Sequence, residues 1–244
     1  MTAGVLDLRQ QARQCQPDLS GYPRELFASA IGTWRARMHN EWTSHRVFEK
    51  LTSQLEAAGF NGGLQRECLA FADEERQHGV LCGAVVEALG GEARVALAAP
   101  AAFPDHADAP PRAALLRNLI HVCCMSETVA VALIGAERLE MPDGSLRALL
   151  DRIYADEIGH ARFGWRLLEE VGLDITLEER TAIERYLPVA FEHLAVHEIS
   201  HLPDLCPPPG GETLGLCSGR DARMLFGETV REVIRPGLAR WFVC

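Results

Sequence analysis

Apolar residues recur at alternating steps of three and four along most of this 244-residue chain, which is the pattern of amphipathic α-helices. The pattern predicts four long helices, over residues 23–58, 63–89, 112–140 and 145–171. Two further helices are expected over residues 176–202 and 219–239. No segment shows the two-residue alternation of a half-buried strand, so the sequence predicts an all-α fold.

Glycine and proline separate the predicted helices. Gly90 and Gly91 end the second helix. Residues 142–144 (Pro-Asp-Gly) form a short turn between the third and fourth, whereas residues 92–111 contain four prolines and predict a long connection. A short turn makes antiparallel neighbours and a long link permits a crossover, so we expect two helical hairpins joined by that link.

The same pattern predicts how the chain is divided. We expect a single domain over residues 1–244. Its core is a helical bundle over residues 23–172, and residues 175–244 add a C-terminal helical extension of about two helices.

Six ionisable residues interrupt the apolar seams of the four long helices. They are Glu41 on the first, Glu75 and His78 on the second, Glu127 on the third, and Glu157 and His160 on the fourth. Burying an unpaired carboxylate costs several kcal/mol, so something must neutralise these charges. Residues three apart on a helix share a face, so each Glu-x-x-His pair offers a carboxylate and an imidazole to one point. The pattern predicts two metal ions in a helical bundle, and the donor types favour Fe or Mn.

A single Glu-x-x-His match is weak evidence, and the chain contains a third one at Glu198 and His201. The joint pattern is more specific, because each seam pair follows a lone seam glutamate by a similar distance, 34 residues from Glu41 to Glu75 and 30 from Glu127 to Glu157. The alternative for the four seam glutamates is ordinary ion pairing with arginine, but the seams hold no matching arginine.

Other histidines and acids near these positions are assigned supporting or solvent-exposed roles. His45 is interpreted as a core or supporting histidine, and Glu49 and Glu74 as solvated residues off the seams. His193, His197 and His201 recur every four residues and share a helix face. We interpret them as a hydrogen-bonded or exposed stripe, with a seventh metal ligand from it as the less favoured alternative.

On these residues the chain resembles the ferritin-like superfamily of non-haem di-iron carboxylate proteins. Residues 72–78 (Ala-Asp-Glu-Glu-Arg-Gln-His) and 155–163 (Ala-Asp-Glu-Ile-Gly-His-Ala-Arg-Phe) look like its second- and fourth-helix signatures. The resemblance covers residues 25–172 and implies a ferritin-like four-helix bundle with two Fe ions, Mn being an alternative at either position. It implies terminal ligands at Glu41 and Glu127, bridging carboxylates at Glu75 and Glu157, and imidazole ligands at His78 and His160.

The resemblance implies chemistry with O2. Departures from the patterns of particular subfamilies reduce the number of reactions to consider. The chain has no C-x-x-C motif for a rubredoxin-type iron domain, and Cys82 stands where radical-storing members place a tyrosine. We therefore expect an oxidase or oxygenase acting on a small organic substrate. An external electron donor and a homodimer are both compatible with this expectation. The alternatives are a ferroxidase or peroxide-scavenging protein, a tRNA-hydroxylating member, and a non-catalytic helical scaffold.

Composition restricts the partners and the compartment. The formal charge of −10 argues against nucleic acid and anionic membranes as partners. Eight cysteines without regular spacing fit a reduced cytoplasmic protein better than a disulfide framework. We find no secretory signal in the N-terminal residues and no stretch of 18 uncharged apolar residues, so no membrane association is expected.

Overall fold

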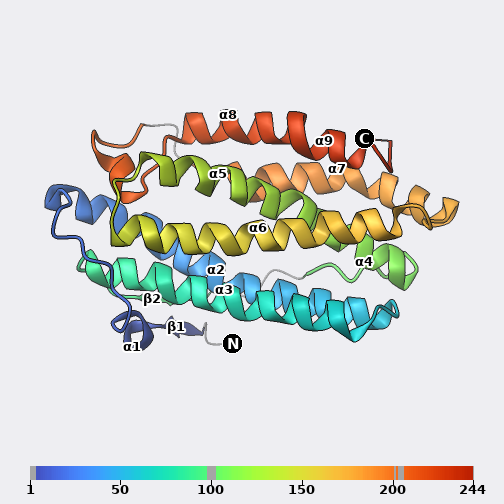
Figure 1. Cartoon of the computed structure of the whole chain (residues 1–244), viewed down its shortest axis with the longest axis horizontal. Helices are drawn as coiled ribbons and strands as arrows, with labels where there is room; N and C mark the ends of the chain where they lie inside the picture. The colour runs from blue at the N-terminus through green and yellow to red at the C-terminus, as the bar shows by residue number, and fades with distance from the viewer. Residues whose placement is uncertain (1–3, 98–102, 201, 203–205, 244) are drawn as a thin grey trace.

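The computed structural model describes residues 4–97, 103–200, 202 and 206–243, and this part of the chain is almost entirely helical (Figure 1). The four predicted long helices are present. They are α2 (Phe27–Ala57), α3 (Gly62–Ala88), the continuous helix made of α4 (Pro111–Leu119), η2 (Ile120–Ser126) and α5 (Glu127–Glu140), and α6 (Ser145–Gly172). The predicted bounds are therefore correct to within a few residues.

Local sequence explains where these helices begin and end. The Asn61 side chain caps α3 by accepting hydrogen bonds from the backbone N–H groups of Gly63 and Leu64. Gly59 and Gly90 adopt positive φ angles of 78° and 85°, which glycine tolerates best, directly after α2 and α3. The turn at Gly59 joins α2 to α3, and residues 141–144 join α5 to α6, so the two hairpins expected from the sequence are present.

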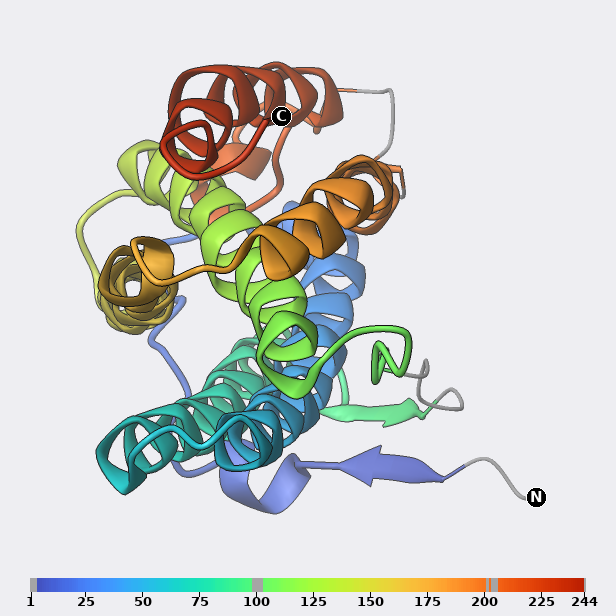
Figure 2. The ribbon, with the colours of Figure 1, turned by 90° about the vertical axis from the view of Figure 1, so that its right-hand side faces the viewer.

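The two hairpins lie against each other, and the C-terminal helices pack outside them (Figure 2). α3 packs on α6, and α2 packs on α4, so residues far apart in sequence surround one interior. The predicted fifth helix is α7 (Leu177–Ile199), which packs on α4 and η2. The predicted sixth helix comprises α8 (Gly219–Thr229), η4 (Val230–Ile234) and α9 (Arg235–Leu238), and α8 lies against α5.

Three features differ from the sequence prediction. A two-stranded antiparallel ribbon pairs β1 (Val5–Asp7) with β2 (Arg94–Ala96), where no strand is expected. A one-turn helix, α1 (Arg9–Ala12), packs on α3. The third long helix also contains a π-helical segment, η2, which ends directly before Glu127. Gly164 allows α6 to approach this segment, because a Cβ there would lie 2.4 Å from the Cβ of Cys123.

The helix from Pro111 to Glu140 is also long and apolar enough to cross a membrane, the one such helix among the described residues. Arg117 and Glu127 interrupt it, so it contains no stretch of 18 uncharged apolar residues. Many of its side chains, such as Leu115, Leu119 and Met125, are fully buried in one of the two apolar clusters of the core. Burial in the core accounts for much of its apolar composition.

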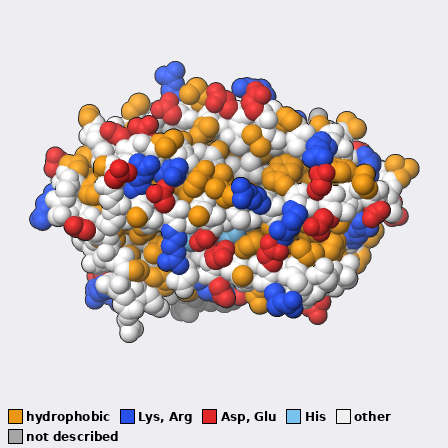
Figure 3. All heavy atoms as spheres, viewed as in Figure 1, with side chains coloured by type: hydrophobic (Ala, Val, Ile, Leu, Met, Phe, Trp, Pro, Cys, Tyr) orange, Lys and Arg blue, Asp and Glu red, His pale blue; other side chains and the backbone are white. Residues whose placement is uncertain are grey.

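The outer surface is mixed in charge on the face drawn in Figure 3. Acidic and basic side chains are interspersed there with apolar ones. The ion pairs Arg166–Glu67 and Arg138–Asp151 bridge neighbouring helices on the surface. Exposed pairs of this kind stabilise a fold by less than about 1 kcal/mol each, so the apolar interior holds the helices together.

Candidate metal centre

The six predicted ligands form a polar layer between the two apolar clusters of the core. On α2, for example, Glu41 lies between Met38 of one cluster and Phe48 of the other. On α6, Glu157 and His160 lie between Ile153 and Phe163 in the same way. The seam of each helix is therefore apolar, then polar for one or two turns, then apolar again, and the polar turns meet at one level.

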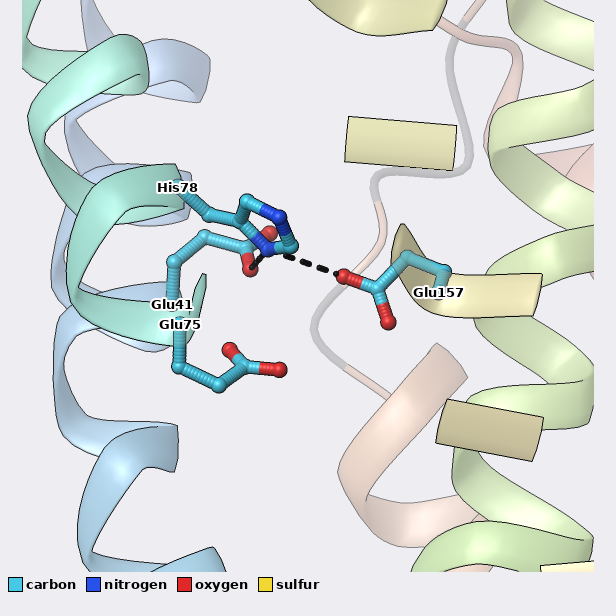
Figure 4. Close-up of side chains that lie close together, drawn as sticks. All are labelled: Glu41, Glu75, His78 and Glu157. Carbon is cyan, nitrogen blue, oxygen red and sulfur yellow. Dashed lines mark ion pairs between the residues drawn. The ribbon is translucent and has the colours of Figure 1, made fainter. Parts of the chain in front are cut away.

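The structure brings all six residues into two overlapping groups of potential ligands. Glu41, Glu75, His78 and Glu157 form the first group, and all four are drawn in Figure 4. Glu75, Glu127, Glu157 and His160 form the second. Within each group the potential ligand atoms lie within 4.8 Å of one another. Glu75 and Glu157 belong to both groups, which is the position required of carboxylates that bridge two ions.

The two imidazoles present the same nitrogen to the centre. His78 Nδ1 lies 3.2 Å from Glu157 Oε1 and 3.6 Å from Glu41 Oε2. His160 Nδ1 lies 3.2 Å from Glu75 Oε1 and 3.3 Å from Glu157 Oε2. Both rings lie side by side with their centroids 6.1 Å apart. Both Nδ1 atoms therefore point into the space enclosed by the four carboxylates.

The opposite nitrogen of each ring is held by a carboxylate from the other hairpin. His78 Nε2 lies 3.0 Å from Asp156 on α6, and His160 Nε2 lies 2.9 Å from Glu74 on α3. A proton on Nε2 donated to these carboxylates leaves the Nδ1 lone pair free to bind a metal. The interpretation of Glu74 as a solvated residue was wrong: its side chain is 39% exposed, yet it positions His160.

Three buried polar atoms at the centre have no hydrogen-bond partner among the described side chains, as expected of atoms that bind a metal ion. His78 Nδ1, His160 Nδ1 and Glu157 Oε2 are buried and have no hydrogen-bond partner in the described chain. Buried polar atoms in folded proteins are almost always paired. The arginine alternative is not seen in the described residues, where Glu41, Glu75 and Glu157 form ion pairs with histidines and no arginine pairs with Glu127. The cluster could hold metal ions, and oxygen and imidazole donors are those that Fe and Mn accept.

Without metal, the cluster retains protons to reduce its negative charge. Burial and the neighbouring Glu157 raise the pKa of Glu75 to about 8, and they raise the pKa of Glu127 well above its usual value. Although burial opposes it, the carboxylates of Glu157 and Glu41 raise the pKa of His78 to about 11. Burial also lowers the pKa of His160, but Glu157 and Glu74 raise it by more. Without metal, the cluster therefore favours the protonated forms of Glu75, Glu127 and both imidazoles.

Metal binding is expected to release these protons. Because metal ligands must be deprotonated, divalent ions compete with protons, and affinity should fall as the pH is lowered from 8 to 6. Each proton displaced changes the apparent affinity about tenfold per pH unit. Titration of metal-free protein with Mn(II) in weak buffer, followed with a pH indicator, should show more than one proton released per ion. Glu228→Gln, at an exposed residue of α8, is a control that should not alter the release, and a pH-independent affinity would contradict the assignment.

The remaining candidates lie outside the two groups. His45 is buried, and its Nδ1 contacts the Trp42 carbonyl. Glu49 forms an ion pair with Arg76. His193 Nδ1 lies 3.2 Å from His121 Nε2, and His197 lies 3.1 Å from Glu198. None of these joins a group of potential ligands in the described chain, and His201 lies outside the described residues.

A cavity of about 1570 Å³ adjoins the centre between α2 and α7. Glu127 lines it, so it reaches one of the two groups of potential ligands. An oxidase is expected to have a closed apolar pocket beside the metals, whereas this cavity is open and lined by both polar and apolar side chains. Its rim includes Leu177 and Val189, whose side chains are 79% and 57% exposed.

No protein family, no curated protein and no solved structure matches this chain. The candidate centre therefore stands on its own geometry: a helical protein in which buried carboxylates and histidines from four helical segments could bind metal.

Proposed function

We propose that this chain is an O2-dependent di-iron oxidase or oxygenase that oxidises a small organic substrate. In this proposal α2, α3, α5 and α6 are a ferritin-like four-helix bundle. The observation that carries it is the sharing of Glu75 and Glu157 between two groups of potential ligands. Four carboxylates and two histidines in this arrangement are the donor set of di-iron and di-manganese carboxylate bundles.

When bound, two iron ions would supply the electrons that reduce O2, and an external donor would restore them. The side chains of this chain hold and shield such a pair. Asp156 and Glu74 fix the orientation of His78 and His160. The rings of Phe71 and Phe48, with centroids 4.6 Å and 5.0 Å from that of His160, exclude water on one side. Glu127 lines the cavity, where a substrate can approach.

The competing proposal is iron handling or oxidant defence without an organic substrate. One observation favours it, because the cavity is open and its walls include the histidines His39, His106, His121, His193 and His197. Imidazoles along an open path can bind entering metal ions transiently. We favour the oxidase, because the cavity also has apolar walls at Val47, Phe48 and Val122, which a path for ions does not need.

Anaerobic loading with Fe(II), followed by rapid mixing with O2, separates these proposals. The oxidase should bind two irons per chain and give a transient visible absorption band. Organic substrates should hasten its decay. Continued oxidation of many irons per chain into a mineral would instead support iron handling, and the absence of stoichiometric binding would contradict both.

A further inference from the structure

The walls of the cavity differ in charge from the rest of the protein. The whole chain has a formal charge of −10, yet three arginines line the cavity: Arg46 on α2, Arg117 on α4 and Arg185 on α7. The Arg117 side chain is already hydrogen-bonded, because it donates to both carboxylate oxygens of Asp108 and to the Ala182 carbonyl. Arg46 and Arg185 have no acidic partner within ion-pair distance among the described residues.

Three acidic side chains also line these walls, and two of them have other partners. Asp108 pairs with Arg117, and Glu127 belongs to the metal centre. Glu178, in the first turn of α7, is the remaining acid among the described lining residues. Among the lining side chains without another partner, two arginines therefore stand against one acid, an excess of positive charge that attracts an anion. Arginine binds carboxylates with two parallel hydrogen bonds, which fixes their orientation as well as their position.

Apolar side chains continue from the arginines toward the metal centre. Val47 follows Arg46 directly on α2, and Phe48 is fully buried and packs on the His160 ring. Val122, on η2, lines the cavity from the opposite wall, five residues before Glu127. The cavity is larger than the 300–1,000 Å³ typical of small-ligand pockets, so an extended hydrocarbon fits within it.

We propose that this cavity binds an amphipathic monocarboxylic acid. Its carboxylate is held by Arg46 and Arg185, and its hydrocarbon part lies along Val47, Phe48 and Val122 toward Glu127. The acid is thereby oriented with its hydrocarbon nearest to the metal centre. That this acid is the molecule oxidised rests on the di-iron function proposed above, whereas its binding in the cavity does not.

Binding can be measured by calorimetry without any turnover. Octanoate and its neutral analogue octanamide are the probes, each titrated into metal-free and into iron-loaded protein. Octanoate should bind at one site per chain, more tightly than octanamide, and more weakly as salt is added. The double variant Arg46→Gln/Arg185→Gln should lose at least tenfold in affinity for octanoate and retain its affinity for octanamide.

A matched control and the single variants keep the test decisive. Arg220→Gln removes an exposed arginine outside the cavity and should leave octanoate binding unchanged. Both cavity arginines are exposed, so their variants should fold, and each single variant should lose part of the affinity. Octanoate binding that is unaffected in the double variant, no binding of octanoate, or tighter binding of octylamine would overturn the proposal.

The two proposals fail separately. If two irons bind and octanoate does not, the di-iron function stands and the substrate class is wrong. If octanoate binds as described and iron does not, the cavity assignment stands and the proposed oxidation is wrong.

Discussion

Replacing Glu157 with glutamine is expected to abolish binding of both metal ions. Glu157 belongs to both groups of potential ligands, and its carboxylate faces both His78 and His160. Glutamine keeps the size of the side chain but loses the charge that a bridging ligand needs. Iron titration should fall from two ions per chain to none, whereas loss of a terminal ligand such as Glu41 should leave one ion bound.

The same variant should remove the effect of metal on thermal stability. Each ion present at 100 times its Kd stabilises the folded state by about 2.7 kcal/mol, so two contribute roughly 5 kcal/mol. For a chain of this size, that corresponds to a fall in Tm of about 10–20 °C when a chelator strips the wild type. Glu157→Gln should show no difference between chelated and metal-loaded samples, and Glu75→Ala should behave alike.

The comparison is made within each variant, so any direct effect of the substitution on the apo fold cancels. Glu198→Gln is the matched control, because Glu198 begins the third Glu-x-x-His match yet lies outside both groups. This variant should keep two irons and the full chelator effect. A wild-type melting curve that chelation does not change would count against the metal centre itself.

The six central residues could be predicted from the sequence because helical periodicity and the cost of burying a charge are properties of each helix on its own. A glutamate at a seam position, such as Glu75, must face the interior of any helical fold in which its seam is buried. The three-residue spacing within each Glu-x-x-His pair then places its imidazole on the same face of the helix as its carboxylate. What periodicity cannot give is the register between helices, and the roles of Asp156 and Glu74 depend on that register.

A signal for these two residues was nevertheless present. Each of the two central motifs has an acidic residue directly before its glutamate, Glu74 before Glu75 and Asp156 before Glu157. Each lies one position off its own seam, where an isolated helix would leave it in solvent. The close packing of α3 on α6 turns each toward the histidine of the other helix.

The features that the sequence did not predict depend on tertiary contacts. The strands β1 and β2 are three residues each, too short for an alternating pattern to be recognised. Cys123 and Glu127 are four residues apart, as in a regular α-helix, so the sequence gives no sign of the π-helical turns of η2. This segment lies against α6 at Gly164, a tertiary contact that no local propensity encodes.

The reciprocal support of the two histidines predicts that the two metal positions can be weakened separately. Asp156→Ala removes the partner of His78 Nε2, and Glu74→Ala removes the partner of His160 Nε2. Loss of such a partner typically lowers metal affinity by 10–100-fold, because the ring is no longer held in the binding tautomer and orientation. Each single variant should therefore bind one ion with near wild-type affinity and the other 10–100 times more weakly, and the double variant should bind both weakly.

Mn(II) titration followed by electron paramagnetic resonance distinguishes these outcomes, because an isolated Mn(II) ion gives a signal that a coupled pair does not. Asp73→Ala is the control for Glu74→Ala: Asp73 is the preceding residue on the same helix, is largely exposed and pairs with Arg76. It should leave both sites intact. Asp156→Asn, which keeps an oxygen acceptor without the charge, should lose less affinity than Asp156→Ala. Equal weakening of both positions by either single variant would mean that the acidic residues act through the total charge of the cluster and not by holding one imidazole each.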